Sequence, residues 1–177
     1  WLLPLFLLRP PAPAPGEMDF TLLDVDQGLA AVAQTARHTL VFDTGARYSA
    51  SFDTGSAVVA PYLRHRGVNR LDMLVISHGD NDHIGGAASL LEAFPPNRVL
   101  SSVPERLQNA QHCFAGQNWR WDGVEFQILN PTGADASGNN SSCVLKITSR
   151  YGSVLFPADI EADAERALLE SGRNLRA

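Results

Sequence analysis

The stretch Ser77–Gly86 reads Ser-His-Gly-Asp-Asn-Asp-His-Ile-Gly-Gly and decides the interpretation of the whole chain. Four potential metal ligands lie within six residues of it, namely His78, Asp80, Asp82 and His83. Imidazole and carboxylate groups together suit Zn, Mn or Fe, because both donor types bind borderline or hard divalent ions. Calcium is disfavoured, since it takes oxygen ligands and avoids imidazole. The stretch therefore predicts a divalent-metal site.

A second interpretation of the same stretch is a polar loop that caps a helix, with Asp82 as the N-cap residue. A cap explains one carboxylate, but it does not explain a second aspartate and two histidines in the same loop. The other histidines, His38, His65 and His112, have no carboxylate spacing around them and are interpreted as surface or packing residues.

The segments on either side of the ligand stretch have clear patterns. Leu71–Ser77 is a compact apolar run, which is typical of a buried strand. Gly86–Phe94 is predicted to be a helix, and Pro95 and Pro96 end it. The ligands are therefore expected in the connection between a buried strand and a helix.

The rest of the chain is predicted to form short strands with helices at intervals. Asp122-Gly123 is the kind of residue pair that favours a tight hairpin turn, because both residues tolerate a positive φ. This succession of elements favours a sheet sandwich covered by helices. The expected strands are Phe20–Val25, Leu29–Gln34, Thr39–Asp43, Arg98–Ser102, Trp119–Trp121, Val124–Leu129, Cys143–Ser149 and Ser153–Phe156, and the other expected helices are Ser56–Arg66 and Ile160–Glu170.

Length and composition indicate a globular domain. The 177 residues are enough for one domain with a real core, and 45% apolar with 19% charged residues excludes a disordered chain. The net charge is −5, and Lys146 is the single lysine. A nucleic-acid binder usually has a basic balance, so any contact with DNA must use a local arginine patch or bound metal ions.

The two cysteines, Cys113 and Cys143, do not form a Cys-x-x-Cys motif, and this spacing disfavours a thiolate zinc site. The simplest expectation is two buried thiols. A disulfide between them is the alternative if the domain lies outside the cytoplasm.

Residues 1–16 are expected to precede the folded domain. Trp1–Leu8 is apolar but much shorter than the roughly 20 residues that span a bilayer, so it suits either the end of a longer transmembrane helix or a hydrophobic leader. Arg9–Gly16 is rich in proline and is expected to be a stiff, extended linker. The folded domain is expected to comprise residues 17–177.

The pattern His78-x-Asp80-x-Asp82-His83, placed after a buried strand, resembles the signature of the metallo-β-lactamase superfamily, which usually reads His-x-His-x-Asp-His. Aspartate in the second position, followed by Ile84-Gly85-Gly86, resembles more narrowly the ComEC family of DNA internalization and competence proteins. Five further segments resemble ComEC motifs in the same order, and the resemblance runs from about Trp1 to Glu170. These segments are Leu23–Gly28, Phe42–Gly45, Ala60–Gly67, Gly138–Leu145 and Phe156–Glu161.

The resemblance implies an α+β fold, the metallo-β-lactamase-like αββα sandwich, with two divalent metal ions, Mn or Zn. It implies that His78 and Asp80 hold one ion, that Asp82 and His83 hold the other, and that Asp159 bridges them. Asp82 would have the catalytic role of orienting or deprotonating the attacking water. From its position alone, Asp159 is equally compatible with an N-cap of the last helix.

Other positions acquire roles or raise questions through the same resemblance. Asn139 and Asn140 lie where related proteins place another metal-binding histidine, and they are kept as candidates that line the site. Asp43 is expected to fix the turn beneath the site by hydrogen bonding. Asp26 and Ala158 replace glycines of the family pattern, which puts the activity in question.

The family's His-His-Gly-Ser motif normally follows the last helix, whereas the chain ends at Ala177. The resemblance therefore implies a fold truncated at its C-terminus, with one metal lacking a ligand. We expect such a chain to bind metal poorly and to be open at its C-terminal edge.

The resemblance implies a metal-dependent nuclease of a DNA-uptake channel, which degrades the strand that is not imported during natural transformation. Its partners would be DNA, single-stranded above all, the transmembrane channel portion of the same parent chain, and other DNA-uptake proteins. The domain would be attached to the inner (plasma) membrane on its extracytoplasmic side. The alternatives are a catalytically inactive module that gates or scaffolds the channel, and another hydrolase of the same fold acting on a lactam, thioester or lactone.

Two groups of side chains have a possible role in binding DNA. Arg64, His65, Arg66 and Arg70 lie before the strand that carries the ligands and could contact phosphates, although a solvated helix end explains them as well. Trp119 and Trp121 could stack on bases, although alternating aromatic residues on a hairpin more often pack against their own sheet.

Overall fold

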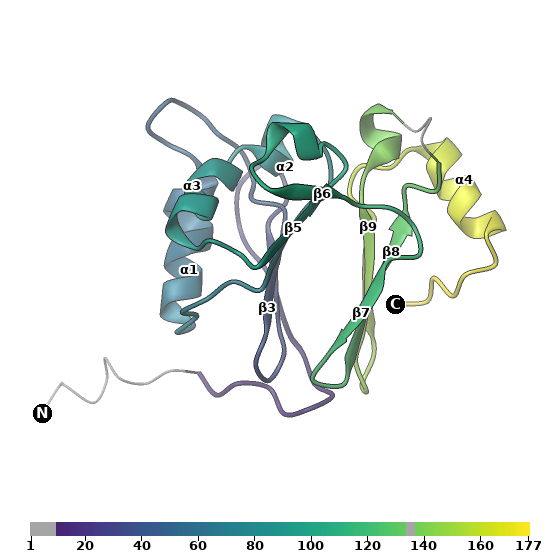
Figure 1. Cartoon of the computed structure of the whole chain (residues 1–177), viewed down its shortest axis with the longest axis horizontal. Coiled ribbons are helices and arrows are strands. Elements are labelled where there is room, and N and C mark those ends of the chain that lie inside the picture. The colour runs from purple at the N-terminus through teal and green to yellow at the C-terminus, as the bar shows by residue number, and fades with distance from the viewer. Residues whose placement is uncertain (1–9, 134–136) are drawn as a thin grey trace, which may run out of the picture.

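Two β-sheets pack face to face in the computed structural model, which describes residues 10–133 and 137–177 (Figure 1). The first sheet has the strand order β1-β2-β3-β4-β5-β6, and the second has the order β10-β9-β8-β7. The strands of the first sheet are β1 (Asp19–Leu22), β2 (Ala31–Gln34), β3 (Thr39–Phe42), β4 (Met73–Ile76), β5 (Arg98–Ser101) and β6 (Ala110–His112). Those of the second are β7 (Asn118–Trp121), β8 (Val124–Asn130), β9 (Val144–Thr148) and β10 (Ser153–Phe156).

The first sheet changes from antiparallel to parallel pairing at β3. Strands β1, β2 and β3 pair antiparallel, whereas β3 to β6 pair parallel. Parallel neighbours need a crossover connection, and helices provide it on the outer face of the sheet. These are the π-helical turn η2 (Gly55–Val59), α1 (Ala60–His65), α2 (Asn81–Ile84) and α3 (Ala87–Ala93), with the 3-10 turn η3 (Pro104–Arg106) before β6.

The second sheet is antiparallel throughout, and α4 (Ala162–Glu170) covers its outer face (Figure 1). Together the layers are helix, sheet, sheet and helix, so the expected αββα sandwich is present. A 3-10 turn, η4 (Gly138–Ser141), precedes β9. Among the described residues, no strand pairs with the outer edge of β10.

Alternation along the strands separates the apolar core into two main layers. On β3, Val41 contributes to the cluster beneath the helices, while Leu40 and Phe42 point between the sheets. Phe42 stacks on Phe156 of the second sheet with ring centroids 4.7 Å apart. Strand β4 is buried on both faces, as parallel central strands are, which explains its uninterrupted apolar sequence.

The structure contains every strand and helix predicted from the sequence, mostly shortened by one or two residues at an end. The expected helix Ser56–Arg66 opens with the π-helical turn η2, and the expected helix Ile160–Glu170 begins at Ala162. The short elements α2 and β6 had not been predicted. Trp119 stacks on Phe126 with their planes 9° apart, so the interpretation of the tryptophans as packing residues is the one that the geometry supports.

Gly16 makes the first firm contacts of the chain with the folded body. Its N–H donates to the carbonyl of Asp122 at 2.6 Å, and its carbonyl accepts from the N–H of Arg150 at 3.0 Å. The apolar run Trp1–Leu8 lies outside the described residues. Within the described part of the chain, none of the helices has the length and apolar character needed to cross a membrane.

The turn between β7 and β8 carries a buried carboxylate that joins the two sheets. Asp122 and Gly123 have φ values of 48° and 91°, which confirms the predicted tight hairpin. The Asp122 side chain is 1% exposed and accepts hydrogen bonds from Thr35, Arg37 and His38, all on the β2–β3 connection. Burial alone would raise the pKa of Asp122, but these hydrogen bonds outweigh it and hold the pKa well below its ordinary value.

Replacing Asp122 with Asn is expected to lower the free energy of unfolding by about 1–3 kcal/mol at pH 7, because the amide cannot accept from all the same donors. Asn tolerates the positive φ, so the turn itself is preserved. A depressed pKa stabilises the fold above the ordinary carboxyl pKa of 3.8 and loses that contribution as the pH falls through the folded-state value. The difference between wild type and variant in urea unfolding should therefore shrink below about pH 4. A difference that stays constant into strong acid contradicts this assignment.

Candidate metal centre

The loop after β4 and the short helix α2 position the predicted ligands. Ser77 and His78 follow directly on the buried strand, and α2 then presents Asp82 and His83 from a single turn. Asp80 occupies the N-cap position of α2, with φ −75° and ψ 147°, but its side chain makes no capping hydrogen bond. Its carboxylate thus remains free. Asp82 lies inside the helix, so its interpretation as the N-cap was wrong.

All five predicted ligands come together at this end of the sheets. Nitrogen or oxygen atoms of His78, His83 and Asp159 lie within 4.8 Å of one another. His78 Nε2 is 3.6 Å from Asp80 Oδ2, and His83 Nε2 is 3.7 Å from Asp82 Oδ2 and 3.4 Å from Asp159 Oδ1. The imidazoles are buried, whereas the carboxylates are 44% to 65% exposed, so the cluster has a buried floor and an accessible rim.

The environment of His78 fits a metal ligand. Its Nδ1 lies 3.0 Å from the hydroxyl of Ser77, while its Nε2 is buried and has no hydrogen-bond partner. A buried polar atom without a partner costs free energy and needs an explanation, and a bound ion supplies one here. A neutral imidazole nitrogen that faces carboxylates is a good donor for a divalent cation. The residues present therefore fit a divalent-metal centre.

Asp43 holds His83 from beneath the cluster. The Asp43 carboxylate is fully buried and accepts from the N–H of Ser77 at 2.6 Å, from the Ser77 hydroxyl at 2.6 Å, and from His83 Nδ1 at 2.8 Å. A carboxylate behind a histidine fixes the ring orientation and leaves Nε2 to face the metal. Asp43 thus acts by hydrogen bonding, as expected, although its partner is the histidine rather than only the turn.

Charge around His83 changes its titration. Burial lowers the pKa of His83, but the hydrogen bond and charge of Asp43, together with Asp159 and Asp82, outweigh burial and raise the pKa above its ordinary value. A carboxylate environment that favours the imidazolium also favours a bound cation in its place. The negative charge around His83 therefore agrees with a cluster of donors that binds a cation.

Asp159 reaches the cluster from the second sheet. It follows β10 by way of Pro157 and Ala158, and Ala158 has the left-handed φ of 53° that glycine would take more readily. The N-cap of α4 is Glu161, so the interpretation of Asp159 as the helix cap was wrong.

The two asparagines kept as site-lining candidates stabilise the turn after Asp159. Asn140 Oδ1 accepts from the Glu161 N–H at 2.8 Å, and Asn139 Nδ2 donates to the Glu161 carboxylate at 3.4 Å. Their hydrogen bonds therefore lie two residues beyond Asp159. These contacts give the asparagines a supporting role at the turn.

The loop that joins β1 to β2 supports Asp82 directly. The N–H of Leu29 donates to the carbonyl of Asp82 at 3.1 Å. Gly28 has φ 133°, and a Cβ added to it would lie 2.3 Å from that same carbonyl oxygen. Asp26 in this loop has φ 63°, so the aspartate found in place of the family's glycine adopts the conformation that glycine favours. The motif around Gly28 thus serves to seat the helix that carries the ligands.

Replacing Gly28 with Ala is expected to lower the free energy of unfolding by about 2–4 kcal/mol and to weaken metal binding, because both the backbone and the Asp82 carbonyl must move. Gly116→Ala is the matched control. Gly116 also has a positive φ, of 99°, but nothing lies within 4 Å of an added Cβ. Chemical unfolding and metal titration of both variants test the prediction. Equal losses in the two variants would show that the contact with Asp82 is unimportant.

Sequence reasoning missed two residues that hold the histidines. Ser77 links Asp43 to both imidazoles, with its hydroxyl 3.0 Å from His78 Nδ1 and 3.3 Å from His83 Nδ1. Thr44 donates its N–H and its hydroxyl to the carbonyl of His83. Thr44 lies in the segment Phe42–Gly45 that resembles the ComEC family, which was a visible signal for it, but nothing in the local pattern pointed to Ser77.

The arginines considered for phosphate contact have partners within the protein itself. Arg66 pairs with Asp19, Arg70 lies beside Asp72, and Arg64 covers the ring of Phe94. These contacts lie toward the start of β4, whereas the ligands follow its end. Their position gives no support to a phosphate contact at the cluster, and Arg66 is ion-paired and only 17% exposed rather than solvated. Arg106 lies beside the ligand loop, where its Nη1 donates to the Gly79 carbonyl at 2.5 Å.

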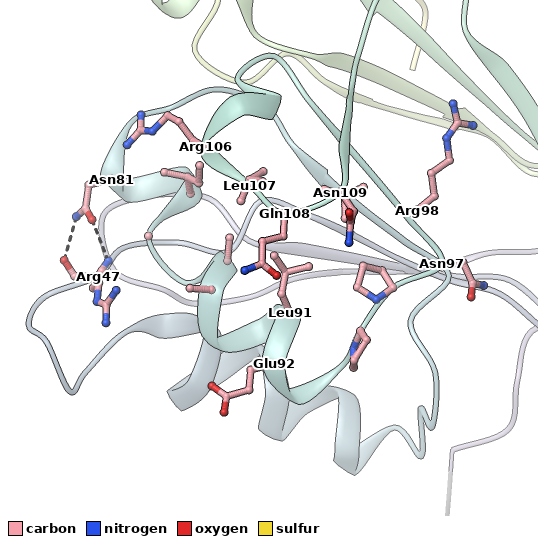
Figure 2. A pocket seen from close by; sticks show the side chains of 17 residues that line it. Arg47, Asn81, Leu91, Glu92, Asn97, Arg98, Arg106, Leu107, Gln108 and Asn109 are labelled. Carbon is pink, nitrogen blue, oxygen red and sulfur yellow. Dashed lines mark hydrogen bonds between the residues drawn. The ribbon is translucent and has the colours of Figure 1, made fainter.

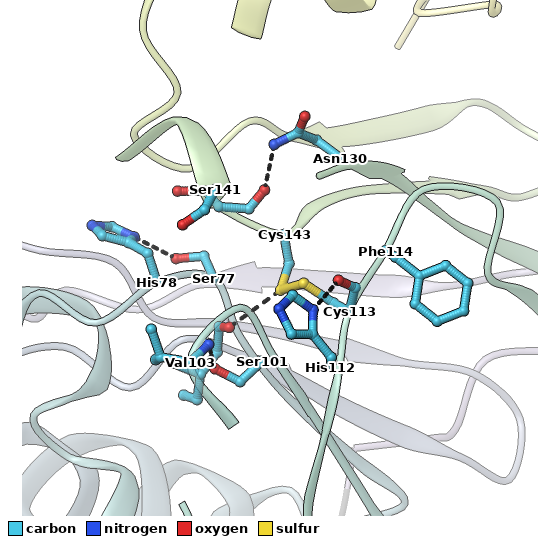
Figure 3. Close-up of a disulfide and its surroundings, with 12 residues drawn as sticks. Ser77, His78, Ser101, Val103, His112, Cys113, Phe114, Asn130, Ser141 and Cys143 are labelled. Atoms are coloured by element: carbon cyan, nitrogen blue, oxygen red, sulfur yellow. Dashed lines mark hydrogen bonds between the residues drawn. A yellow bond between two sulfur atoms is a disulfide. The ribbon is translucent and has the colours of Figure 1, made fainter. Parts of the chain in front are cut away.

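A disulfide joins the two sheets next to the cluster (Figure 3). Cys113, just after β6, is bonded to Cys143, just before β9, so the expectation of two free thiols was wrong. The N–H of Cys143 donates to the carbonyl of Ser77 at 2.9 Å. The cross-link therefore braces the residue that orients both histidines.

A cluster of histidines and aspartates at one end of an αββα sandwich defines a known class of protein. The chain belongs to the metallo-β-lactamase superfamily, whose family model matches residues 23–176. Members of this superfamily are generally metal-dependent hydrolases that typically bind divalent metals.

Within this superfamily, the chain is similar to competence and recombination proteins. Competence protein ComA of Neisseria gonorrhoeae is 37% identical over 94% of this chain. Recombination protein 2 of Haemophilus influenzae is 36% identical over 81% of it, and ComE operon protein 3 of Bacillus subtilis is 28% identical over 98%. The chain covers only 23%, 18% and 26% of these three proteins, respectively, so it corresponds to about a quarter or less of their length.

Solved structures agree on the fold. The metallo-β-lactamase SMB-1, in complex with mercaptoacetic acid, superposes with a TM-score of 0.65 over 94% of this chain and 76% of that chain, at 13% identity. The metallo-β-lactamase-fold protein YhfI of Bacillus subtilis gives a TM-score of 0.54 over 80% of this chain and 62% of that chain, at 15% identity. At such identities the likeness concerns the fold alone.

Proposed function

We propose that this chain is a metal-dependent phosphodiesterase domain that degrades DNA during DNA uptake. The observation that carries the proposal is the convergence of His78, His83 and Asp159 within 4.8 Å, with a buried imidazole nitrogen that has no partner. Asp80 and Asp82 complete the donor set at its exposed rim.

The roles of the side chains follow from their positions. His78 and Asp80 would hold one cation, Asp82 and His83 a second, and Asp159 would contact both. Two divalent cations, Mn²⁺ or Zn²⁺, would supply Lewis acidity toward a phosphodiester and lower the pKa of a nearby water.

The protein's own groups supply orientation and proton transfer. Asp82 is half exposed at the rim, where its carboxylate can orient or deprotonate the attacking water. Asp43 keeps the Nδ1 proton of His83 directed away from the site.

Similarity to competence and recombination proteins supports DNA as the substrate. On this proposal, the chain is part of a longer membrane protein, works on the extracytoplasmic side of the inner membrane, and acts with the channel portion of the same protein and with other DNA-uptake proteins. The Cys113–Cys143 disulfide supports that location, because disulfides persist in oxidising compartments.

A second candidate is hydrolysis of a small acyl substrate. Hydroxyacylglutathione hydrolase of Stenotrophomonas maltophilia is 32% identical over 59% of this chain, although the chain covers only 41% of that protein. An inactive gating or scaffolding module is the other alternative. The five expected metal donors of the cluster are present and converge, and this favours an active metal centre over an inactive gating or scaffolding role.

The test is cleavage of end-labelled single-stranded DNA by the protein extended through the expected His-His-Gly-Ser motif. Mn²⁺, Zn²⁺ and EDTA are compared in parallel, and hydroxyacylglutathione is offered separately to the same preparation. Asp80→Ala removes one donor, while Asp163→Ala removes an exposed carboxylate of α4 as the matched control.

We expect cleavage that needs a divalent metal, disappears in Asp80→Ala, and persists in Asp163→Ala. A folded protein that holds two metal ions and leaves DNA intact would overturn the nuclease proposal. Turnover of the thioester in that preparation would then favour the second candidate, and inertness toward both substrates would favour the gating role.

A further inference from the structure

An aromatic pair stands exposed on the connection between β3 and η2. Tyr48 and Phe52 are 51% and 52% exposed, and their ring centroids are 5.7 Å apart. Two neighbouring exposed rings form a contiguous apolar patch, and patches of this kind often mark binding sites. In Figure 1 this connection projects at the end of the molecule that carries α2.

Hydrogen bonds within the loop hold the backbone that carries the pair. The N–H of Tyr48 donates to the carbonyl of Phe52 at 3.0 Å, and Arg47 pairs with Asp53 in an isolated antiparallel bridge. The Arg47 guanidinium donates to the carbonyls of Ser49 and Ala50 and so closes the tip from within. These bonds fix the backbone positions from which the two rings project.

The same loop is attached to the ligand-bearing helix. Asn81, which lies between the predicted ligands Asp80 and Asp82, accepts from the Arg47 N–H at 3.2 Å and donates to the Arg47 carbonyl at 3.1 Å. Figure 2 shows this reciprocal pair. On the other side, the Tyr48 hydroxyl donates to the carbonyl of Val25 at 3.3 Å, in the loop that seats Asp82. The aromatic pair is therefore placed beside the metal cluster by hydrogen bonds on both flanks.

Cationic side chains border the same region. Arg47 and Arg106 line, with Asn81, one end of a groove of about 810 Å³ that runs between α3 and the segment after η3 (Figure 2). Arg106 reaches the Gly79 carbonyl, one residue from His78. On a chain of net charge −5, arginines beside an acidic ligand cluster are suited to phosphate groups that approach it.

We propose that Tyr48 and Phe52 form a platform on which unpaired bases of a single-stranded nucleic acid stack, while Arg47 and Arg106 contact its phosphates. The identity of this ligand rests on the proposed function. Aromatic faces bind any base, because every base has a π-face, so the platform selects for exposed bases rather than for sequence. Duplex DNA keeps its bases stacked internally, so the platform favours single strands.

The test compares two oligonucleotides of equal length and charge, one of thymidines and one in which abasic sites replace the bases. Binding is followed by fluorescence anisotropy in EDTA, so that no cleavage occurs. Because the electrostatic contribution is the same for both probes, the ratio of their dissociation constants isolates the contribution of the bases. Wild type is expected to bind the thymidine probe about 10- to 100-fold more tightly than the abasic probe.

Substitutions of the two rings test whether they cause the preference for the thymidine probe. Tyr48→Ala combined with Phe52→Ala should bring the ratio close to one, whereas Tyr48→Phe, which keeps the ring, should retain the preference. Tyr151→Ala is the matched control, since Tyr151 is 75% exposed beside Arg150 on the β9–β10 turn, at the opposite end of β10 from Asp159.

Equal binding of the two probes by wild type overturns the platform, and so does a double variant that keeps the preference. Failure to bind either probe also overturns it and points to a protein or membrane partner for the rings. Base-dependent binding without metal-dependent cleavage would leave the platform standing and remove the nuclease. Metal-dependent cleavage without base-dependent binding would support the nuclease and remove the platform.

Discussion

Replacing Asp43 with Asn is expected to weaken the binding of divalent metal by about 10- to 100-fold, although Asp43 is not itself one of the proposed ligands. The carboxylate accepts three hydrogen bonds, two from Ser77 and one from His83 Nδ1. An amide of the same size has one acceptor atom, and its N–H₂ group would face donors. Where that group meets Nδ1, the histidine proton must move to Nε2, which then no longer offers a lone pair to a cation.

The same substitution changes the pH dependence. Asp43 is a main reason why the pKa of His83 is raised, and protons compete with metal for this imidazole. Metal binding by wild type should therefore weaken as the pH falls through this raised pKa. In Asp43→Asn the pKa of His83 drops, so the weakening should begin at a lower pH.

In the metal-free protein, the free energy of unfolding depends on pH in the opposite direction from metal binding: this contribution is largest at low pH. A raised pKa stabilises the fold fully below the ordinary histidine pKa of 6.5, and this contribution is lost as the pH rises through the folded-state value. Asp43→Asn should reduce that dependence, because Asp159 and Asp82 still raise the pKa of His83. The unmatched donors should lower the free energy of unfolding by about 1–3 kcal/mol.

Asp53→Asn is the matched control for this experiment. Asp53 is also buried, and it accepts hydrogen bonds from Ser56 and Ser89 rather than from the cluster. Calorimetric titration with Mn²⁺ or Zn²⁺ should show unchanged affinity in Asp53→Asn, even if that variant is less stable. An Asp43→Asn protein with the affinity of wild type would contradict the assignment of Asp43 as the residue that positions His83.

Removing the disulfide is expected to lower the free energy of unfolding by about 3–4 kcal/mol. Cys113 and Cys143 are separated by 30 residues, and a closed loop of that length restricts the unfolded chain by about this amount. Both side chains are fully buried between the sheets, so the variant Cys113→Ala with Cys143→Ala also leaves a small void. The loss is a large fraction of the stability of a domain of this size.

The cross-link should also affect the metal centre. Cys143 donates to the carbonyl of Ser77, and Ser77 in turn holds Asp43 and the two histidines. Denaturant unfolding with and without a reductant measures the stability, and metal titration of the reduced protein measures the site. The double alanine variant should not respond to the reductant. A fully reduced wild type with unchanged stability would contradict this account of the cross-link.

The parts of the fold that could be predicted from the sequence are those with a local signal. The apolar run of β4 and the Asp122-Gly123 turn are examples, because a buried parallel strand and a positive-φ pair each require particular residues. Helix α2 could not be predicted, since four residues are too few to show a helical period. Strand β6 has three largely exposed residues and is defined by its pairing with β5 rather than by its own composition.

In the candidate site, too, residues with a local sequence signal could be predicted from it, whereas those brought in by distant segments could not. The four donors of Ser77–Gly86 are close in sequence, so their proximity in space was predictable. Asp159 joins them only because β10 of the second sheet docks against the first, and its assignment depended on resemblance to a family. For Arg64, Arg66 and Arg70 the sequence left two interpretations open, because closeness in sequence to β4 does not say which end of the strand they lie beside.

The most direct test of the central claim is to count the metal ions that the cluster holds. The protein extended through the expected His-His-Gly-Ser motif is dialysed to equilibrium against Mn²⁺ or Zn²⁺, and the bound metal per chain is measured by elemental analysis. His78→Ala and Asp159→Ala are compared with Asp163→Ala. We predict two ions per chain in wild type and in Asp163→Ala, and a loss of bound metal in the other two variants. A folded wild type that binds no metal, or a His78→Ala protein that binds as much as wild type, would contradict the claim that these side chains form a metal centre.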